Sequence, residues 1–106
     1  MTPTVSVPAR VREKFQRLAA SWREESRFLS NGVQIAMLEP YQRIIGMGEA
    51  VVPLILEEMR REPGHWFWAL HAITETDPIP PGARGNVREM TDAWLAWGRA
   101  QGLIDL

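Results

Sequence analysis

Cysteine is absent from the 106-residue chain, which excludes disulfide bonds and zinc sites built on thiolates. No stretch approaches the roughly 18 consecutive apolar residues that a membrane-spanning helix requires. Residues 1–7 lack a basic start followed by a long apolar run, so we expect no signal peptide. Together with the missing cysteine, these features favour a cytoplasmic location.

A strong excess of either charge is also missing, since 12 basic and 13 acidic residues leave a net charge of −1. Such a balance gives no general reason to bind nucleic acid or an anionic membrane. The two signs are nevertheless separated along the chain. Basic residues prevail in residues 1–30 and acidic residues in residues 31–80. Two interpretations are open: the basic face of the first helix is simply solvated, or it meets an acidic partner.

Apolar residues are plentiful and make up 45% of the chain, which predicts folding rather than disorder. The length suits a single domain covering residues 1–106, and the first residues, 1–7, are expected to be frayed. Apolar side chains recur at helical spacing, which predicts an all-α fold. We expect a compact bundle of four main helices, near residues 8–27, 49–62, 65–76 and 86–101, and one short helix near residues 40–45.

Two segments are less regular. Apolar residues alternate in residues 33–39 as in a strand, but a lone strand would have no pairing partner, so we interpret them as loop or weak helix. Residues 77–83 are rich in proline and are expected to form an extended connector with Ile79 turned inward. The inner rows of the main helices predict a shared core of Phe15, Trp22, Leu54, Ile55, Leu70, Ile73, Met90 and Trp94.

Residues 44–76 resemble a single HEAT-like helical hairpin. The resemblance rests on Gly48 to Ile55, which read GEAVVPLI, and on the apolar helix from Trp66 to Ile73 after the break at residues 63–64. No second copy appears at the expected period of about 40 residues, so the resemblance implies one hairpin and no solenoid. Residues 41–48, 65–70 and 94–98 together also resemble a group of small bacterial proteins with no assigned activity.

Five tryptophans are a high load for this length, and tryptophan is enriched at protein-binding hot spots. Trp66 and Trp68 point about 200° apart around one helix, and a single small core would not bury both fully. We therefore expect an exposed apolar surface that binds protein. Its expected members are Trp68, Phe67, Tyr41 and Trp97.

Other constellations are weaker. Glu57, Glu58 and Glu62 are expected on a solvated helix face. The pair His71 and Glu75 is one helical turn apart and marks the place of an unrecognised enzyme site, although no catalytic, metal or cofactor motif is apparent. A basic helix face is the basis for nucleic-acid binding, with the candidates Arg10, Lys14, Arg17 and Arg43.

The first interpretation is therefore a non-enzymatic protein-interaction module, such as a bacterial accessory or regulatory protein that docks on another protein or on its own copy. The alternatives are a nucleic-acid-associated protein and a small enzyme with a site near His71. Exposure of Trp68 would favour the first, a continuous basic face the second, and a deep pocket holding His71 the third.

Overall fold

The computed structural model describes residues 7–105, which contain six α-helices and no strand. The all-α class is as expected, but one helix more is present than predicted. The frayed start falls outside the described residues except for Val7, which is partly buried against the core. In chain order the helices are α1 (Ala9–Ser26), α2 (Gly32–Met37), α3 (Glu39–Gly46), α4 (Val52–Arg61), α5 (Phe67–Thr74) and α6 (Val87–Ala100).

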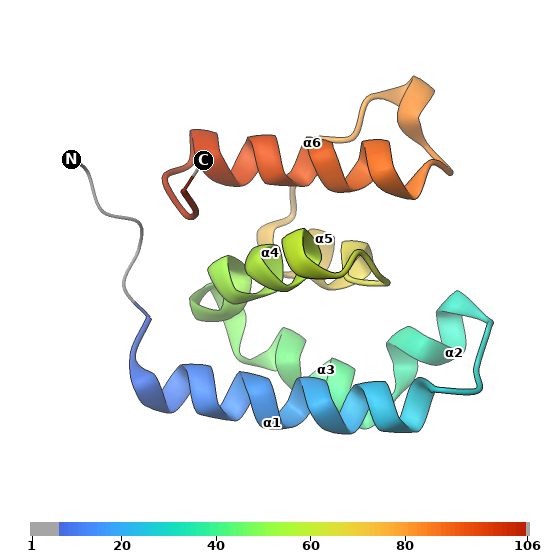
Figure 1. Cartoon of the computed structure of the whole chain (residues 1–106), viewed down its shortest axis with the longest axis vertical. Coiled ribbons are helices and arrows are strands. Elements are labelled where there is room, and N and C mark those ends of the chain that lie inside the picture. The colour runs from blue at the N-terminus through green and yellow to red at the C-terminus, as the bar shows by residue number, and fades with distance from the viewer. Residues whose placement is uncertain (1–6, 106) are drawn as a thin grey trace.

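The helices lie in three layers (Figure 1). The long helix α1 forms one outer layer together with α2 and α3, α4 and α5 form the middle layer, and α6 forms the opposite outer layer. Two short 3-10 turns complete the chain, η1 (Gly48–Val51) before α4 and η2 (Pro81–Ala83) before α6. No helix within residues 7–105 has the length and apolar character needed to cross a membrane.

Helix α2 occupies the segment that the alternating pattern left open between loop and weak helix. Its start is set by Asn31, whose side-chain oxygen accepts hydrogen bonds from the backbone N–H groups of Val33 and Gln34 at 2.9 and 3.1 Å. This N-cap satisfies two donors that a helix start leaves without partners. The capping side chain therefore decides for a helix where apolar spacing is ambiguous.

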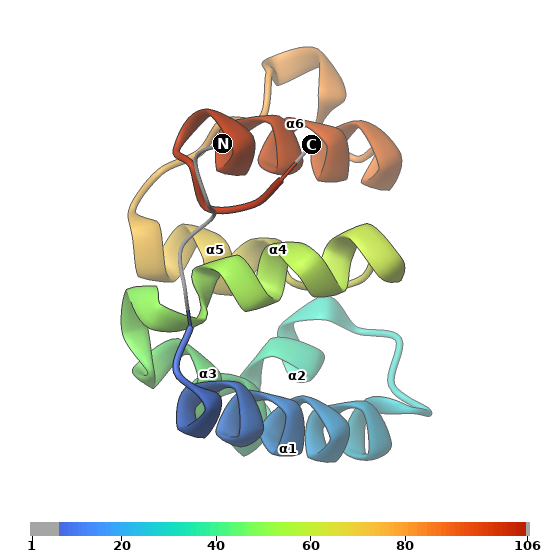
Figure 2. The same ribbon diagram turned by 60° about the vertical axis from the view of Figure 1, so that its left-hand side comes forward.

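An aromatic cluster joins α1, α3 and the start of α5, helices whose ribbons lie in adjoining layers in Figure 2. Trp66 lies at its centre, with ring-centroid distances of 4.6 Å to Trp22 and 5.8 Å to both Phe15 and Tyr41. All four side chains are buried. Aromatic pairs at such distances add stability beyond the area they bury, so this cluster holds the first layer to the second.

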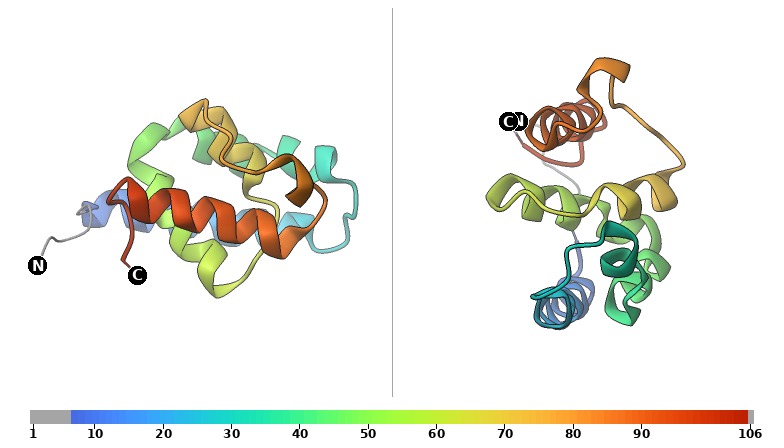
Figure 3. Two further views of the ribbon diagram at one scale, coloured as in Figure 1. Left: turned by 90° about the horizontal axis from the view of Figure 1, so that it is seen from above. Right: turned by 90° about the vertical axis from the view of Figure 1, so that its right-hand side faces the viewer.

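The buried row of α6 differs from expectation. The helical spacing of the apolar residues in α6 predicts a buried row of Val87, Met90, Trp94 and Trp97, but Val87 is exposed, and Met90 and Trp97 are only partly buried. The buried residues are instead Thr91, Trp94, Leu95 and Gly98. The reason is the close crossing of α6 over α4 (Figure 3): a Cβ at Gly98 would lie 2.6 Å from Leu56 Cδ1. The missing side chain turns the Gly98 side of α6 inward.

The remaining core follows the prediction closely. Of the expected core residues, Ile73 and Met90 are partly buried and the others are buried. Ile79 in the proline-rich segment is buried as well. Residues 75–80 have no regular secondary structure, but the segment then turns into η2 instead of staying extended to residue 83.

Candidate functional site

Trp68 is the large aromatic residue that α5 leaves at the surface, where half of its area, 50%, is exposed. Beside it on α2 lie Val33 and Ala36, and together with Phe67 these side chains line a shallow hollow of about 390 Å³. Val33 is itself 57% exposed. We call the surface formed by Val33, Ala36, Phe67 and Trp68 the α2–α5 surface. It brings together two segments that are more than 30 residues apart in the chain.

The α2–α5 surface belongs to helices without formal charge. Neither α2, with 6 residues, nor α5, with 8, contains Asp, Glu, Lys or Arg, although these types make up 24% of the chain. The central part of a protein interface is depleted of charged residues in the same way. Trp68 and Phe67 were expected at this surface from the sequence. Val33 was not, because the sequence left open whether residues 33–39 form a helix.

Tyr41 was expected at this surface, and that expectation is wrong. Its side chain has no exposed area, and its hydroxyl donates a hydrogen bond to the His65 carbonyl oxygen at 2.8 Å. The same hydroxyl accepts from the backbone N–H of Ala69 at 2.9 Å. It thus stands between two backbone groups at the start of α5 and provides a cap that α5 lacks locally.

The environment of Tyr41 also changes its acidity. Burial raises the pKa of the Tyr41 phenol above its ordinary value, while the hydrogen bond from Ala69 offsets part of this rise. The phenol therefore stays protonated through the neutral range, as its donated hydrogen bond to His65 requires. Tyr41, on α3, therefore stabilises the start of α5 and is not available for contact with a partner protein.

Trp97, the other expected member, lies on α6. Its ring meets that of Trp94 in a T-shaped arrangement with a centroid distance of 5.3 Å, and it is partly buried. It lines neither the α2–α5 surface nor the neighbouring hollow. Trp97 therefore remains separate from the surface around Trp68.

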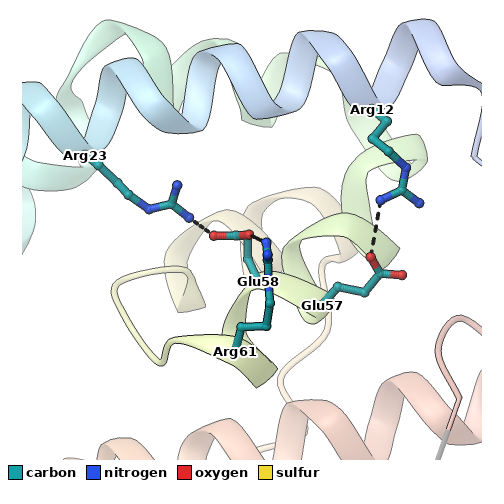
Figure 4. Close-up of polar contacts among 5 residues, drawn as sticks. All are labelled: Arg12, Arg23, Glu57, Glu58 and Arg61. Carbon is teal, nitrogen blue, oxygen red and sulfur yellow. Dashed lines mark hydrogen bonds and ion pairs between the residues drawn. The ribbon is translucent and has the colours of Figure 1, made fainter.

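The basic residues of α1 meet the acidic residues of α4 within the same chain (Figure 4). Arg12 approaches Glu57 at 3.4 Å, and Arg23 pairs with Glu58, which also pairs with Arg61. Glu58 is 7% exposed, so its assignment to a solvated face is wrong. The segregation of charge along the chain thus serves, at least in part, to join α1 to the middle layer.

The candidates for nucleic-acid binding have mixed surroundings. Arg10, Lys14 and Arg17 are exposed on α1 and take part in no ion pair among the described residues. Arg43 on α3 lies 3.5 Å from Glu39, one turn away. A carboxylate beside this arginine weakens its attraction for phosphate. Of these four candidates, the three without an ion pair among the described residues therefore lie in the first three turns of α1.

His71 and Glu75 are one helical turn apart in sequence, a spacing that allows them to pair, but no hydrogen bond or ion pair joins them among the described residues. Glu75 ends α5 in a left-handed conformation, at φ 54°, and His71 Nδ1 lies 3.1 Å from the Thr76 carbonyl oxygen. Nearby, Asp77 pairs with Arg84 and accepts from the Ile79 N–H. The bonds from Arg84 and then Ile79 lower the pKa of Asp77, so its carboxylate stays ionised at neutral pH.

This group of residues lines a cleft between α5 and α6, with a volume of about 510 Å³. The ionised Asp77 is a poor general acid, and the cleft contains no serine, threonine or cysteine in its lining. His71 therefore lines a cleft whose described lining contains no hydroxyl or thiol nucleophile.

No protein-family model matches the chain, and no curated protein or solved structure is significantly similar to it.

Proposed function

We propose that this protein is a non-enzymatic binding module whose α2–α5 surface receives an uncharged, apolar segment of another protein. The observation that carries the proposal is the half-exposed Trp68 on a pair of neighbouring helices that contain no formal charge. Tryptophan has a large apolar area and few rotatable bonds, which makes it a frequent anchor of protein interfaces.

Exposure of neighbouring apolar side chains supports the same proposal. Val33 and Met37 on α2 are both more than half exposed, at 57% and 59%. A patch of adjoining apolar side chains at the surface of a small protein often marks an interface. The patch is not flat, because it contains the hollow beside Trp68, and a partner's apolar side chain can enter this hollow between α2 and α5.

The proposal is tested by quantitative co-purification of the wild type and three variants from the native cell. Trp68→Gln and Val33→Gln should both lose the same partner, while Val87→Gln should retain it. Val87 is a matched control because it is also an exposed apolar residue, 51% exposed, but lies on α6 outside the surface. Circular dichroism should show all three folded, with stability changes within about 0.5 kcal/mol.

The outcome decides in either direction. A protein that depends on both Trp68 and Val33, and binds the purified wild type directly, supports the proposal. Unfolding of Trp68→Gln would show that the residue is needed for the core, and unchanged co-purification would show that the surface binds no partner. If Trp68→Gln and Val33→Gln lose only self-association, measured by sizing, the occupant of the surface is a second copy of the chain and not another protein.

A finer assignment of the fold accompanies this proposal. We assign α4 and α5 to a HEAT-like hairpin, supported by Pro53 in the first turn of α4 and by the break between the helices at residues 62–66. Such a hairpin in a small bacterial accessory or regulatory protein would present α5 to a partner.

Nucleic-acid binding by Arg10, Lys14 and Arg17 has less support, because Arg12, Arg23 and Arg43 are already paired with carboxylates.

A further inference from the structure

The cleft between α5 and α6 lies on the other side of Phe67 and Trp68 from α2. Its volume of about 510 Å³ falls in the range of small-molecule sites. Its walls are mainly apolar and come from α5, the proline-rich segment and α6. The apolar wall residues are Phe67, Trp68, Ile79, Met90 and Trp94.

The charged groups at the cleft balance one another. Asp77 and Arg84 form an ion pair, and the Asp77 carboxylate also accepts the Ile79 N–H. An ionic ligand would have to compete with this pair for either partner. A neutral ligand leaves the pair intact, so the charges favour a ligand without formal charge.

Trp94, which lines the cleft, has a polar group that lacks a hydrogen-bond partner among the described residues. Its side chain is buried, and its indole Nε1 has no hydrogen-bond partner among the described residues. The indole N–H is a donor only, and a buried donor without an acceptor is rare in native proteins. In contrast, the Nε1 of buried Trp22 donates to the Ile35 carbonyl oxygen at 3.0 Å. Trp94 therefore calls for an acceptor, and it is one of the residues that line the cleft.

The Trp94 nitrogen is itself covered, so a ligand reaches it only when a neighbouring side chain moves. Met90 lines the same cleft, is partly buried and belongs to the same helix. Its unbranched thioether side chain adapts readily to a changed space. A hydrogen bond from Trp94 Nε1 to a ligand in the cleft therefore requires a shift of a wall residue such as Met90.

We propose that the cleft between α5 and α6 binds a neutral, mainly apolar small molecule with one carbonyl-type acceptor, which takes the hydrogen of Trp94 Nε1. The apolar body fills the space between Phe67, Ile79 and Met90. The acceptor satisfies the indole N–H. This site shares Phe67 and Trp68 with the α2–α5 surface, but the proposal does not require that surface to bind a partner.

The test compares 1-indanone with indane, two probes of nearly the same shape of which the first alone has a carbonyl acceptor. Both are titrated into the ¹⁵N-labelled full chain, and the five tryptophan indole N–H resonances are followed by NMR. We expect indanone to bind roughly fivefold more tightly, which corresponds to a net hydrogen bond of about 1 kcal/mol. The Trp94 indole resonance should move downfield with indanone and not with indane.

Trp94→Phe removes the donor and keeps an aromatic ring, so it should abolish the preference for indanone. Trp97→Phe makes the same change on the same helix outside the cleft. Because the Trp97 ring packs on Trp94, this variant also controls for altered packing of that ring, and it should keep the preference. If Trp94→Phe does not fold, the affinity ratio and the Trp94 resonance of the wild type decide the question alone.

Equal affinities for the two probes, absence of binding, or a preference that survives in Trp94→Phe would each overturn the proposal. Shifts confined to the methyl groups of Val33 and Ala36 would also overturn it, because the probe would then occupy the α2–α5 surface. Partner loss in Trp68→Gln is measured separately, so failure of one proposal does not imply failure of the other.

Discussion

The two ends of the three-layer structure satisfy their buried polar groups to different degrees. At the α1 side, the Trp22 Nε1 and the Tyr41 hydroxyl both have backbone partners, and the aromatic rings form one connected cluster. At the α6 side, the Trp94 Nε1 and the Thr91 Oγ1 are buried without partners among the described residues. Fully satisfied polar groups specify one arrangement, whereas unpaired ones leave a cost that a ligand or partner can remove.

The comparison also concerns how each layer is held. Helix α1 packs on α3 and has ion pairs to α4, whereas α6 contacts mainly α4 and leaves clefts beside it. Hydrogen bonds and charge pairs therefore add direction to packing at the α1 side. At the α6 side, the close contact of Gly98 with Leu56 fixes the place where α6 crosses α4. Stability and rigidity should differ accordingly.

The largest expected difference is between the same substitution made at the two ends. Trp22→Phe should lower the free energy of unfolding by about 2–3 kcal/mol, because it removes buried ring volume and leaves the Ile35 carbonyl oxygen without its donor. Trp94→Phe loses ring volume but no hydrogen bond, and should cost about 1 kcal/mol. Urea unfolding followed by circular dichroism measures both values. An equal or greater cost for Trp94→Phe would contradict the comparison.

The second prediction concerns the cap from Tyr41. Tyr41→Phe should cost about 1–2 kcal/mol, because the Ala69 N–H and the His65 carbonyl oxygen both lose a partner inside the core. Thermal or urea unfolding at neutral pH measures this cost. A Phe variant as stable as the wild type would show that the hydroxyl contributes nothing net.

The same residue predicts a loss of stability in alkali. Since the folded-state pKa of Tyr41 is raised, the unfolded chain releases the phenolic proton first as pH rises above its ordinary value of 10.0. The unfolded state then binds fewer protons than the folded state, so the free energy of unfolding falls with pH above that point. Tyr41 is the only tyrosine, so absorbance of tyrosinate at high pH reports it directly. Tyr41→Phe should flatten this part of the profile.

The smallest expected effect separates the two ion pairs between α1 and α4. Arg23→Ala should cost about 1 kcal/mol, because its partner Glu58 is nearly buried and keeps only Arg61. Arg12→Ala should cost less than about 0.5 kcal/mol, since both Arg12 and Glu57 are well exposed to water. Urea unfolding at low and high salt measures both. A larger cost for Arg12→Ala would show that burial of the carboxylate does not decide the strength of the pair.

Prediction from sequence succeeded where a helix has one apolar and one polar face. The expected first helix, 8–27, agrees with α1 because its apolar residues recur in one stripe, and the last helix begins near residue 86 as expected, where the Asn86 side chain caps α6. It was less successful where the inward side depends on a neighbour. The buried row of α6 was displaced because Gly98 has no hydrophobic side chain, yet allows the closest approach to α4.

The candidate site shows the same division. The sequence indicated that the segment around residues 65–76 has more large apolar side chains than one face can bury, and Trp68 is indeed half exposed. It could not show that Val33 would lie beside Trp68, since the two residues are brought together only by the packing of α2 and α5 against α3. Nor could it show that Tyr41 would point inward to cap α5.

The sequence by itself determined the all-α class, most helix positions and the identity of most core residues, because these depend on local capping and on apolar spacing within one helix. Only the tertiary structure decided how the aromatic side chains around α5 are arranged, with Tyr41 buried and Val33 beside Trp68. A helix that is apolar nearly all round, as α5 is, has no polar face to mark its outer side. Its orientation is therefore set by its neighbours: Tyr41 hydrogen-bonds to the backbone on both sides of Trp66, and the Trp22 ring packs on Trp66, which leaves Trp68 outside.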